Sequence, residues 1–196
     1  RGYRESLPCR CVGITGSVGK TTTKEMIAAV LRTALRTQWT EKNYNNEIGL
    51  PVSVLRLKPD CEAAGLEMGM NHLSVLTRIA QPDLAVITNI GTMHIENLGS
   101  REGILRAKLE ILEGLRPGGR VIFNGDDALL RPLAARYHAV CFGLSEGCDV
   151  RASRVQETAE DSKFTVHAFG KSFEAALSVP GLHNVLDALA AAAVGL

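Results

Sequence analysis

The sequence lacks the features that mark nucleic-acid-binding, membrane-spanning and secreted proteins. Its 196 residues have a formal net charge of +1 at pH 7, so no strong field favours nucleic acid or an acidic membrane. Apolar residues make up 45% of the chain, but no uninterrupted apolar run is long enough to cross a bilayer. No basic-then-apolar signal peptide opens the chain. We therefore expect one cytoplasmic domain, without nucleic-acid binding or membrane insertion.

The cysteines lack a recognisable pattern. Cys9, Cys11, Cys61, Cys141 and Cys148 form no Cys-x-x-Cys pair, so neither a zinc ribbon nor a disulfide framework is indicated. We expect reduced thiols, as in a cytosolic protein.

A phosphate-loop segment, VGITGSVGKTTTKEM (12–26), lacks the first glycine of the common pattern, because Ile14 stands where that glycine is expected. The context nevertheless suits a phosphate: a strand ends, small residues turn, and a helix opens at Lys20. Lys20 would reach the β- and γ-phosphates, and Thr21 would bind Mg²⁺. The alternative is an ordinary glycine-rich turn. A lysine at a helix start opposes the helix dipole unless an anion is bound there, which favours the nucleotide interpretation.

The rest of the chain predicts an α/β fold, a mostly parallel sheet flanked by helices with a few appended antiparallel strands. Apolar strands are expected at 9–15, 63–70, 84–90, 119–125 and 138–143, alternating with helices at 20–36, 73–80, 101–115 and 128–137. From 149 onward the alternation of polar and apolar residues predicts antiparallel strands at 149–156, 163–169 and 171–177, with a turn at Gly170-Lys171. A last helix starts near His183.

Polar residues follow two apolar strands at the edge of the sheet where the phosphate loop lies. Glu67 ends one strand, and could either point into water or bind Mg²⁺ beside the γ-phosphate. Asn89, His94, Glu96 and Asn97 crowd the loop after the next strand. A histidine in a loop is usually solvated, but this one could bind metal or contact substrate.

Lys108 falls on the apolar stripe of its predicted helix, four residues after Ile104 and four before Leu112. Two interpretations remain open. The lysine could extend along the stripe and reach water. Alternatively, it could turn into the site, where a desolvated amine is readily deprotonated and could react with CO₂ to form a carbamate.

These motifs together resemble the central ATPase domain of the Mur ligases, and within that family the MurF type. The resemblance covers almost the whole chain and rests on these segments: TGSVGKTT, NYNNEIGLP (43–51), LEMGMNH, TNIGTMHIENLGS, RAKLEI and GLHNVLDALAAAAV.

The resemblance implies an ATP-dependent ligase of peptidoglycan precursor synthesis. ATP would phosphorylate the carboxylate of UDP-MurNAc-tripeptide, and the amine of D-Ala-D-Ala would attack the acyl phosphate. It also implies a monomer in which an amino-terminal UDP-binding domain and a carboxy-terminal domain accompany residues 1–196. Alone, this chain is expected to bind ATP weakly and not to ligate.

The resemblance assigns roles to particular residues. Lys20, Glu67, His94 and Lys108 would be catalytic. Thr21 and Glu67 would hold one Mg²⁺, and His94 with a carbamylated Lys108 would hold a second. The remaining contacts would be with ATP through Thr15, Gly16, Ser17, Val18, Gly19, Lys20, Thr21, Thr22, Asn89, His183 and Asn184, and with the muramoyl peptide through Asn45 and Asn46.

The sequence departs from the family pattern at two places. Asp187 replaces the second Asn of the His-Asn-x-x-Asn pattern that begins at His183, which puts that contact in doubt. After His72 the usual Gly-Glu-Ile segment is missing.

Other functions remain open. Within the superfamily, the chain could be a MurE-type, cyanophycin or folylpolyglutamate ligase, or a MurT-type amidotransferase partner, although the four-cysteine zinc insertion typical of the last is missing. A regulatory module that uses ATP as a switch would not need Lys108. A small-molecule kinase should have an arginine-rich lid, and no such segment is evident.

Overall fold

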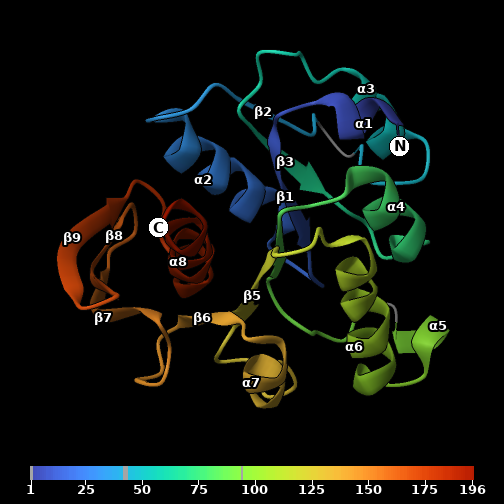
Figure 1. The fold of residues 1–196 in the computed structure, drawn as a ribbon. Coiled ribbons are helices and arrows are strands. Elements are labelled where there is room, and N and C mark those ends of the chain that lie inside the picture. The colour runs from blue at the N-terminus through green and yellow to red at the C-terminus, as the bar shows by residue number, and fades with distance from the viewer. Residues whose placement is uncertain (1, 42–43, 94) are drawn as a thin grey trace.

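One nine-stranded sheet organises the protein, and helices cover both of its faces (Figure 1). The computed structural model describes residues 2–41, 44–93 and 95–196. Along the sheet the strands follow the order β2 (Thr37–Trp39), β3 (Ala63–Glu67), β1 (Arg10–Thr15), β4 (Leu84–Ile87), β5 (Arg120–Asn124), β6 (Val140–Gly143), β7 (Val150–Glu157), β8 (Ser162–Ala168) and β9 (Lys171–Leu177). All neighbours from β2 to β7 are parallel, and β7–β8 and β8–β9 are antiparallel. This confirms the predicted fold class, with β7 itself parallel to β6.

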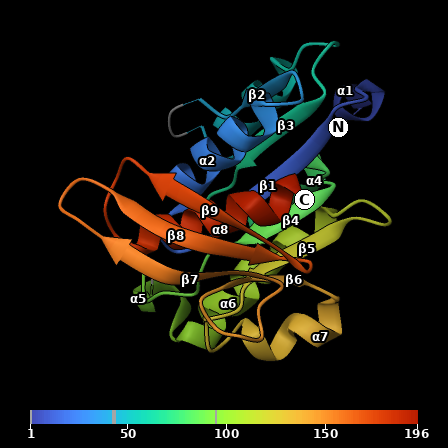
Figure 2. The ribbon, with the colours of Figure 1, turned by 90° about the vertical axis from the view of Figure 1, so that its left-hand side faces the viewer.

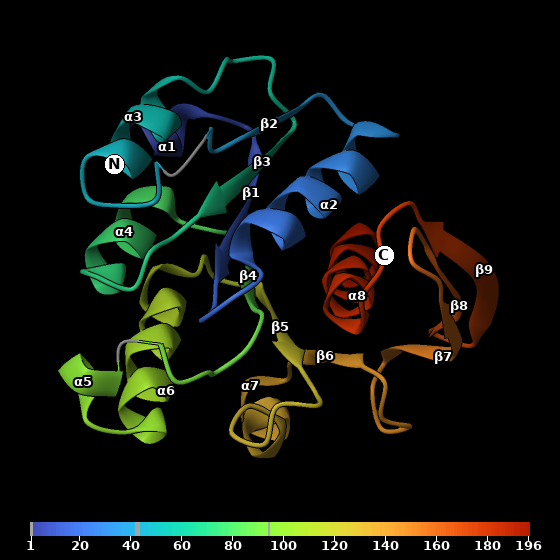
Figure 3. The same ribbon diagram turned by 180° about the vertical axis from the view of Figure 1, so that it is seen from behind.

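Two groups of helices complete the layers (Figure 3). One face of the sheet packs against α2 (Lys20–Arg32) and α8 (Leu182–Gly195), where Ile27 and Val185 join Val86 in one core. On the other face, Leu76 and Ile104 join Phe123. The helices on or near that face are α1 (Gly2–Ser6), α3 (Gly49–Leu55), α4 (Leu73–Ala80), α5 (Ile95–Leu98), α6 (Arg101–Leu109), η1 (Glu110–Gly114), η2 (Arg131–Leu133) and α7 (Ala134–Tyr137).

The antiparallel strands curve around α8, which lies behind them in Figure 2. The turn between β8 and β9 is at Phe169-Gly170, so the prediction of Gly170-Lys171 was wrong by one residue. Both turn residues have positive φ, 48° and 78°, as a two-residue hairpin turn requires. None of the helices in the described ranges is long and apolar enough to cross a membrane.

Several predicted helices differ from those observed. The helix predicted at 20–36 ends at Arg32, where the Thr33 hydroxyl donates back to the Val30 carbonyl and the chain turns towards the short edge strand β2. The helix predicted at 128–137 is divided into η2 and α7. Pro132 stands at the start of η2, and a proline cannot donate a backbone hydrogen bond. The sequence did not predict helix α3, because the helix begins Gly-Leu-Pro. A proline is tolerated in a helix only within the first turn.

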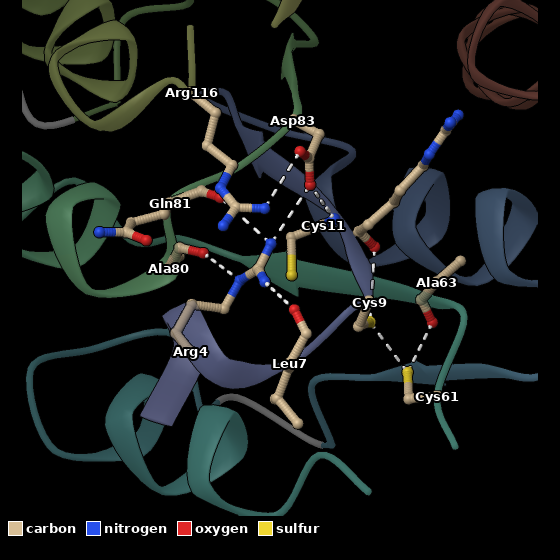
Figure 4. A network of polar contacts seen from close by, with 11 residues as sticks. Arg4, Leu7, Cys9, Cys11, Cys61, Ala63, Ala80, Gln81, Asp83 and Arg116 are labelled. Carbon is tan, nitrogen blue, oxygen red and sulfur yellow. Dashed lines mark hydrogen bonds and ion pairs between the residues drawn. The ribbon is translucent and has the colours of Figure 1, made fainter. Parts of the chain in front are cut away.

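A polar network fastens α1 to the amino-terminal ends of the strands, opposite the phosphate loop (Figure 4). Arg4 is fully buried, donates to the Ala80 carbonyl at 2.8 Å and pairs with Asp83 at 3.2 Å. Asp83 also accepts from the Cys11 amide at 2.7 Å. All five cysteines are free, as expected from the sequence.

Candidate functional site

The candidate site lies where β1, β3 and β4 end, at the carboxyl edge of the parallel strands. A cavity of about 230 Å³ opens there, lined by Gly16, Ser17, Lys20, Asn45, Asn46, Gly69, Met70, Asn71 and Lys108. Ligands of open parallel sheets bind at this edge. A larger cavity of about 560 Å³ lies at the opposite edge, beside Gln81 and Arg116, and none of the predicted site residues lines it.

The phosphate loop between β1 and α2 requires glycine at two positions. Gly19 has a φ of 81°, and a Cβ there would lie 2.8 Å from Asp187 Oδ1. A Cβ on Gly16 would collide with Thr88 Oγ1. The Thr88 hydroxyl donates to the Val18 carbonyl at 2.7 Å. The close approach of β4 therefore fixes the shape of this loop although the usual first glycine is missing.

The segment after β4 is hydrogen-bonded to the phosphate loop. The Ser17 and Val18 amides donate to the backbone and side-chain oxygens of Asn89, at 3.1 and 3.0 Å. The Gly91 amide donates to Ser17 Oγ at 2.9 Å. Asn89, expected to contact ATP, therefore uses its side chain to hold the loop.

Helix α2 begins with unsatisfied donors. Gly19 provides no side-chain cap, and within the described ranges the amides of residues 20–22 donate to no acceptor. Such a helix start attracts an anion. The Lys20 ammonium curls over the loop and donates to the Gly16 carbonyl at 2.9 Å and the Ser17 carbonyl at 3.3 Å. Burial lowers the pKa of Lys20, and the nearby Glu67 opposes that shift. Unpaired amides and a lysine thus converge where a phosphate would be bound.

Glu67 is buried at the end of β3 and faces the loop, with an exposed fraction of 3%. Thr21 Oγ1 donates to Glu67 Oε2 at 2.9 Å, and Asn45 Nδ2 donates to Glu67 Oε1 at 2.8 Å. The interpretation of Glu67 as a glutamate pointing into water was therefore wrong. A hydroxyl oxygen and a carboxylate beside a phosphate cradle are the hard oxygen donors that Mg²⁺ prefers, so the residues fit such an ion.

Lys108 lies in α6 and lines the same cavity, with an exposed fraction of 2%. Burial, with a smaller contribution from the charge of Lys20, lowers its pKa to about 8. Across the described ranges its ammonium makes no hydrogen bond or ion pair. The side chain thus lies along the cavity with little surface exposed, and its reaction with CO₂ stays a prediction. His94, the other expected ligand of a second metal, lies outside the described residues, and within them no group of three or more His, Cys, Asp or Glu side chains is placed to hold a metal ion.

Some of the remaining predicted residues line the cavity, and the others lie beside it. Asn45 and Asn46 line the cavity, while Asn46 Oδ1 also accepts from the Gly49 amide at 2.8 Å, at the start of α3. Thr15 is buried and donates to the Met68 carbonyl, and Thr22 is exposed on the first turn of α2.

His183 and Asn184 are on the first turn of α8 and do not line the cavity. The Asn184 side chain donates to the Pro180 carbonyl at 2.6 Å. Helix α8 itself packs along α2.

Sequence reasoning missed Thr88 and Lys24, which shape the site, and did not predict the contact that Asp187 makes. Thr88 fixes the loop, as described above. Lys24 is buried and donates to the Thr40 carbonyl at 2.7 Å, tying α2 to the segment that leads to Asn45. Asp187 is buried against the loop and accepts from Thr23 Oγ1 at 2.7 Å. The run of threonines after Lys20 was the available signal for such a partner, because a hydroxyl inside a buried helix needs an acceptor.

Comparison with known proteins agrees with this geometry. Residues 14–195 match the model of the Mur ligase middle domain. The chain is 44% identical to UDP-N-acetylmuramoyl-tripeptide–D-alanyl-D-alanine ligase of Bacillus subtilis over 198 residues, covering all of this chain and 43% of that protein. The chain thus spans less than half the length of this relative.

Two solved structures are also similar. A crystal structure of MurF from Acinetobacter baumannii matches 97% of this chain and 43% of its own, at 36% identity and a TM-score of 0.90. MurF ligase from Thermotoga maritima in complex with ADP matches 96% of this chain and 46% of its own, at 32% identity and a TM-score of 0.87. The chain belongs to the Mur ligase family and contains the middle domain of that family.

Proposed function

We propose that this chain is the ATP-binding core of a ligase that joins D-Ala-D-Ala to UDP-MurNAc-tripeptide through an acyl phosphate. The observation that supports this best is one cavity that combines the phosphate loop, Lys108 and the Asn45-Asn46 segment, with Glu67 bonded to both Thr21 and Asn45. The residues that would bind the nucleotide and those that would contact the muramoyl peptide therefore line one cavity. The likeness to proteins named as this ligase supports the choice of substrates.

The residues divide the work of phosphoryl transfer. The amides at the start of α2 and the Lys20 ammonium would bind the β- and γ-phosphates and offset the charge that the transfer concentrates there. The substrate carboxylate would attack the γ-phosphorus along the side of the cavity formed by Asn45 and Asn71. The incoming amine would then displace phosphate from the acyl phosphate. The Lys20 ammonium and the amides at the start of α2 would favour anionic substrates.

Thr21 and Glu67 would hold Mg²⁺, which when bound supplies charge neutralisation at the transferred phosphoryl group. We also propose that Lys108 reacts with CO₂. Its neutral amine forms a C–N bond to the carbon and loses one proton to solvent, leaving an anionic carbamate. This change replaces a buried cation with two oxygen donors, which would serve a second Mg²⁺ together with His94.

The larger setting is part of the proposal. Because the chain spans less than half of its relatives' length, we propose that separate domains bind the UDP moiety and deliver the amino substrate. The protein would act as a monomer in the cytoplasm, where ATP is available and free thiols such as those found here persist.

The test is ATP consumption and product formation by the protein at its full encoded length. ADP should accumulate rapidly only when both UDP-MurNAc-tripeptide and D-Ala-D-Ala are present. Faster turnover with a UDP-MurNAc-dipeptide and meso-diaminopimelate or lysine would indicate a MurE-type ligase instead. ATP binding without turnover on any acid and amine pair would favour a regulatory module.

A further inference from the structure

Asp187 lies directly behind the phosphate loop. It is on α8, with an exposed fraction of 7%. Its Oδ1 accepts a hydrogen bond of 2.7 Å from Thr23 Oγ1, and the Thr23 amide donates to the Gly19 carbonyl at 2.8 Å. A Cβ on Gly19 would lie only 2.8 Å from the same Oδ1. One carboxylate therefore contacts both the last residue of the loop and the first turn of α2.

This carboxylate has no ion-pair partner among the residues that the structure describes. Burial raises its pKa to about 6, although the Thr23 hydrogen bond and the charge of His183 both favour the ionised form. Cations on the packed elements are directed elsewhere. Lys20 Nζ is bonded to loop carbonyls, and Lys24 Nζ is bonded to the Thr40 carbonyl and paired with Glu25. The other charged side chains on the helix and strands packed against α8 are Arg32 on α2, Arg120 on β5, Arg151, Arg154 and Glu157 on β7, and Lys163 with His167 on β8.

We propose that Asp187 is a positioning residue of the phosphate loop, and that its carboxylate takes up a proton from solvent when a nucleotide phosphate occupies the loop. This inference rests on the nucleotide site proposed above. The phosphates add negative charge on one side of the loop while Asp187 lies on the other, and like charges at short range favour protonation. The step is a proton transfer from solvent or buffer to one carboxylate oxygen, and no bond of the nucleotide changes. Oδ1 can still accept from Thr23, so the loop keeps its support.

Proton uptake makes nucleotide binding depend on pH in a defined direction. Below the pKa of the free protein, Asp187 is already neutral and binding needs no extra proton. Between the pKa of the free protein and the higher pKa of the nucleotide-bound protein, binding is accompanied by proton uptake, so affinity falls as pH rises through that window. If the nucleotide raises the pKa by one unit, affinity should fall by up to about tenfold between pH 5.5 and 8.5, and about 0.4 proton should be taken up per nucleotide at pH 7.

The experiment is calorimetry of MgADP binding to the protein at its full encoded length, at pH 7, in PIPES and in imidazole, buffers with different ionisation enthalpies. The difference in heat gives the number of protons taken up, and needs no variant. Asp187→Asn, a neutral side chain of the same shape, should lose about 0.4 proton relative to wild type and bind up to about tenfold more tightly at pH 8.5. Protons bound or released by the nucleotide itself are common to all variants.

Asp161→Asn is the matched control. Asp161 is on the turn between β7 and β8, and its pKa is lowered by the Thr158 hydroxyl, so it stays ionised and the variant should behave as wild type. Equal proton uptake in wild type and Asp187→Asn, or equal pH profiles of affinity, would overturn the inference while leaving the nucleotide site intact. Failure of wild type to bind MgADP would overturn the proposed nucleotide site and this inference together.

Discussion

Lys20 and Lys108 line one cavity, and the charge of Lys20 adds to burial in lowering the pKa of Lys108 to about 8. Lys20 donates to two loop carbonyls, whereas Lys108 makes no hydrogen bond or ion pair within the described ranges. A buried cation of this kind destabilises the fold. Its presence is explained if the site uses the amine as a chemical group.

Lys108→Met should therefore stabilise the protein while removing its activity. A fall in pKa from 10.5 to about 8 corresponds to an upper limit of roughly 3 kcal/mol of penalty at pH 7, at about 1.36 kcal/mol per unit. Because the folded pKa lies below the unfolded one, wild type regains this stability as pH rises from about 8 to 10.5. Denaturant unfolding in CO₂-free buffer should show the variant more stable at pH 7, with a gain that shrinks by pH 10.

Lys58→Met provides the control for that comparison, since Lys58 is exposed and its variant should show no such trend. A Lys108→Met protein less stable than wild type at pH 7 would contradict the unpaired, desolvated state of this lysine.

The carbamate on Lys108 can be detected directly. With ¹³C-labelled bicarbonate, wild type should show a carbamate carbon resonance that is missing from Lys108→Ala. The variant should lose nearly all ligase activity, and short carboxylates such as acetate should restore part of it by filling the space of the carbamate. Full activity of Lys108→Ala would mean that the amine has no chemical role.

Glu67→Gln should weaken the response to Mg²⁺. The amide cannot supply the negative charge that a hard cation prefers, so turnover should fall by about 10- to 100-fold at low Mg²⁺ and recover partly at high Mg²⁺. Glu62→Gln makes the same chemical change just before the other end of β3, where Glu62 accepts from the Arg36 amide. That control should match wild type, and an equal loss in both variants would remove Glu67 from the metal site.

Gly19→Ala tests whether the phosphate loop needs a glycine at this position, and Gly118→Ala is the matched control. The two glycines have φ values of 81° and 79°, but only Gly19 has a neighbour within 4 Å of the added Cβ, Asp187 Oδ1. Both variants should lose about 1 kcal/mol from the left-handed backbone. Gly19→Ala should lose more, and MgADP affinity should fall at least tenfold only there. Unchanged affinity would show that the loop tolerates a displaced Asp187.

Arg4→Met separates stability from function. Arg4 is buried at the amino-terminal edge of the sheet and pairs with Asp83, which is also 3.6 Å from Arg116. Removing it leaves buried carbonyls and a carboxylate less satisfied, so the free energy of unfolding should fall by about 2–4 kcal/mol. MgADP affinity of the folded protein should stay within about twofold of wild type. A larger loss of affinity would mean that the two edges of the sheet are coupled.

Much of the fold could be predicted because the parallel strands are short apolar segments bounded by clear turns. Helix α4 was predicted with its observed bounds, and β1 to within one residue. The sequence pattern did not predict the ends of elements that are set by tertiary contacts. Strand β3 was predicted to continue to residue 70 but ends at Glu67, because the Gly69 amide leaves the sheet to bond with the Asn45 carbonyl at 2.7 Å.

Within the site, the residues of the phosphate loop, Glu67 and Lys108 could be found because each breaks a local rule. A lysine opens a helix, a carboxylate ends a buried strand, and another lysine falls on an apolar stripe. Nothing in a single segment marks Thr88, and Asp187 departs from the family pattern without showing which residue it contacts. Their roles depend on contacts 70 and 164 residues away along the chain, to Val18 and Thr23, which only the folded structure reveals.

The most direct test of the central claim is an isotope transfer in the ligase reaction. UDP-MurNAc-tripeptide labelled with ¹⁸O in its reacting carboxylate is incubated with ATP, Mg²⁺ and D-Ala-D-Ala, and the inorganic phosphate is examined by mass spectrometry. An acyl phosphate requires that one carboxylate oxygen leave with the phosphate, so each phosphate should contain one ¹⁸O atom. Product formed with unlabelled phosphate would contradict the account.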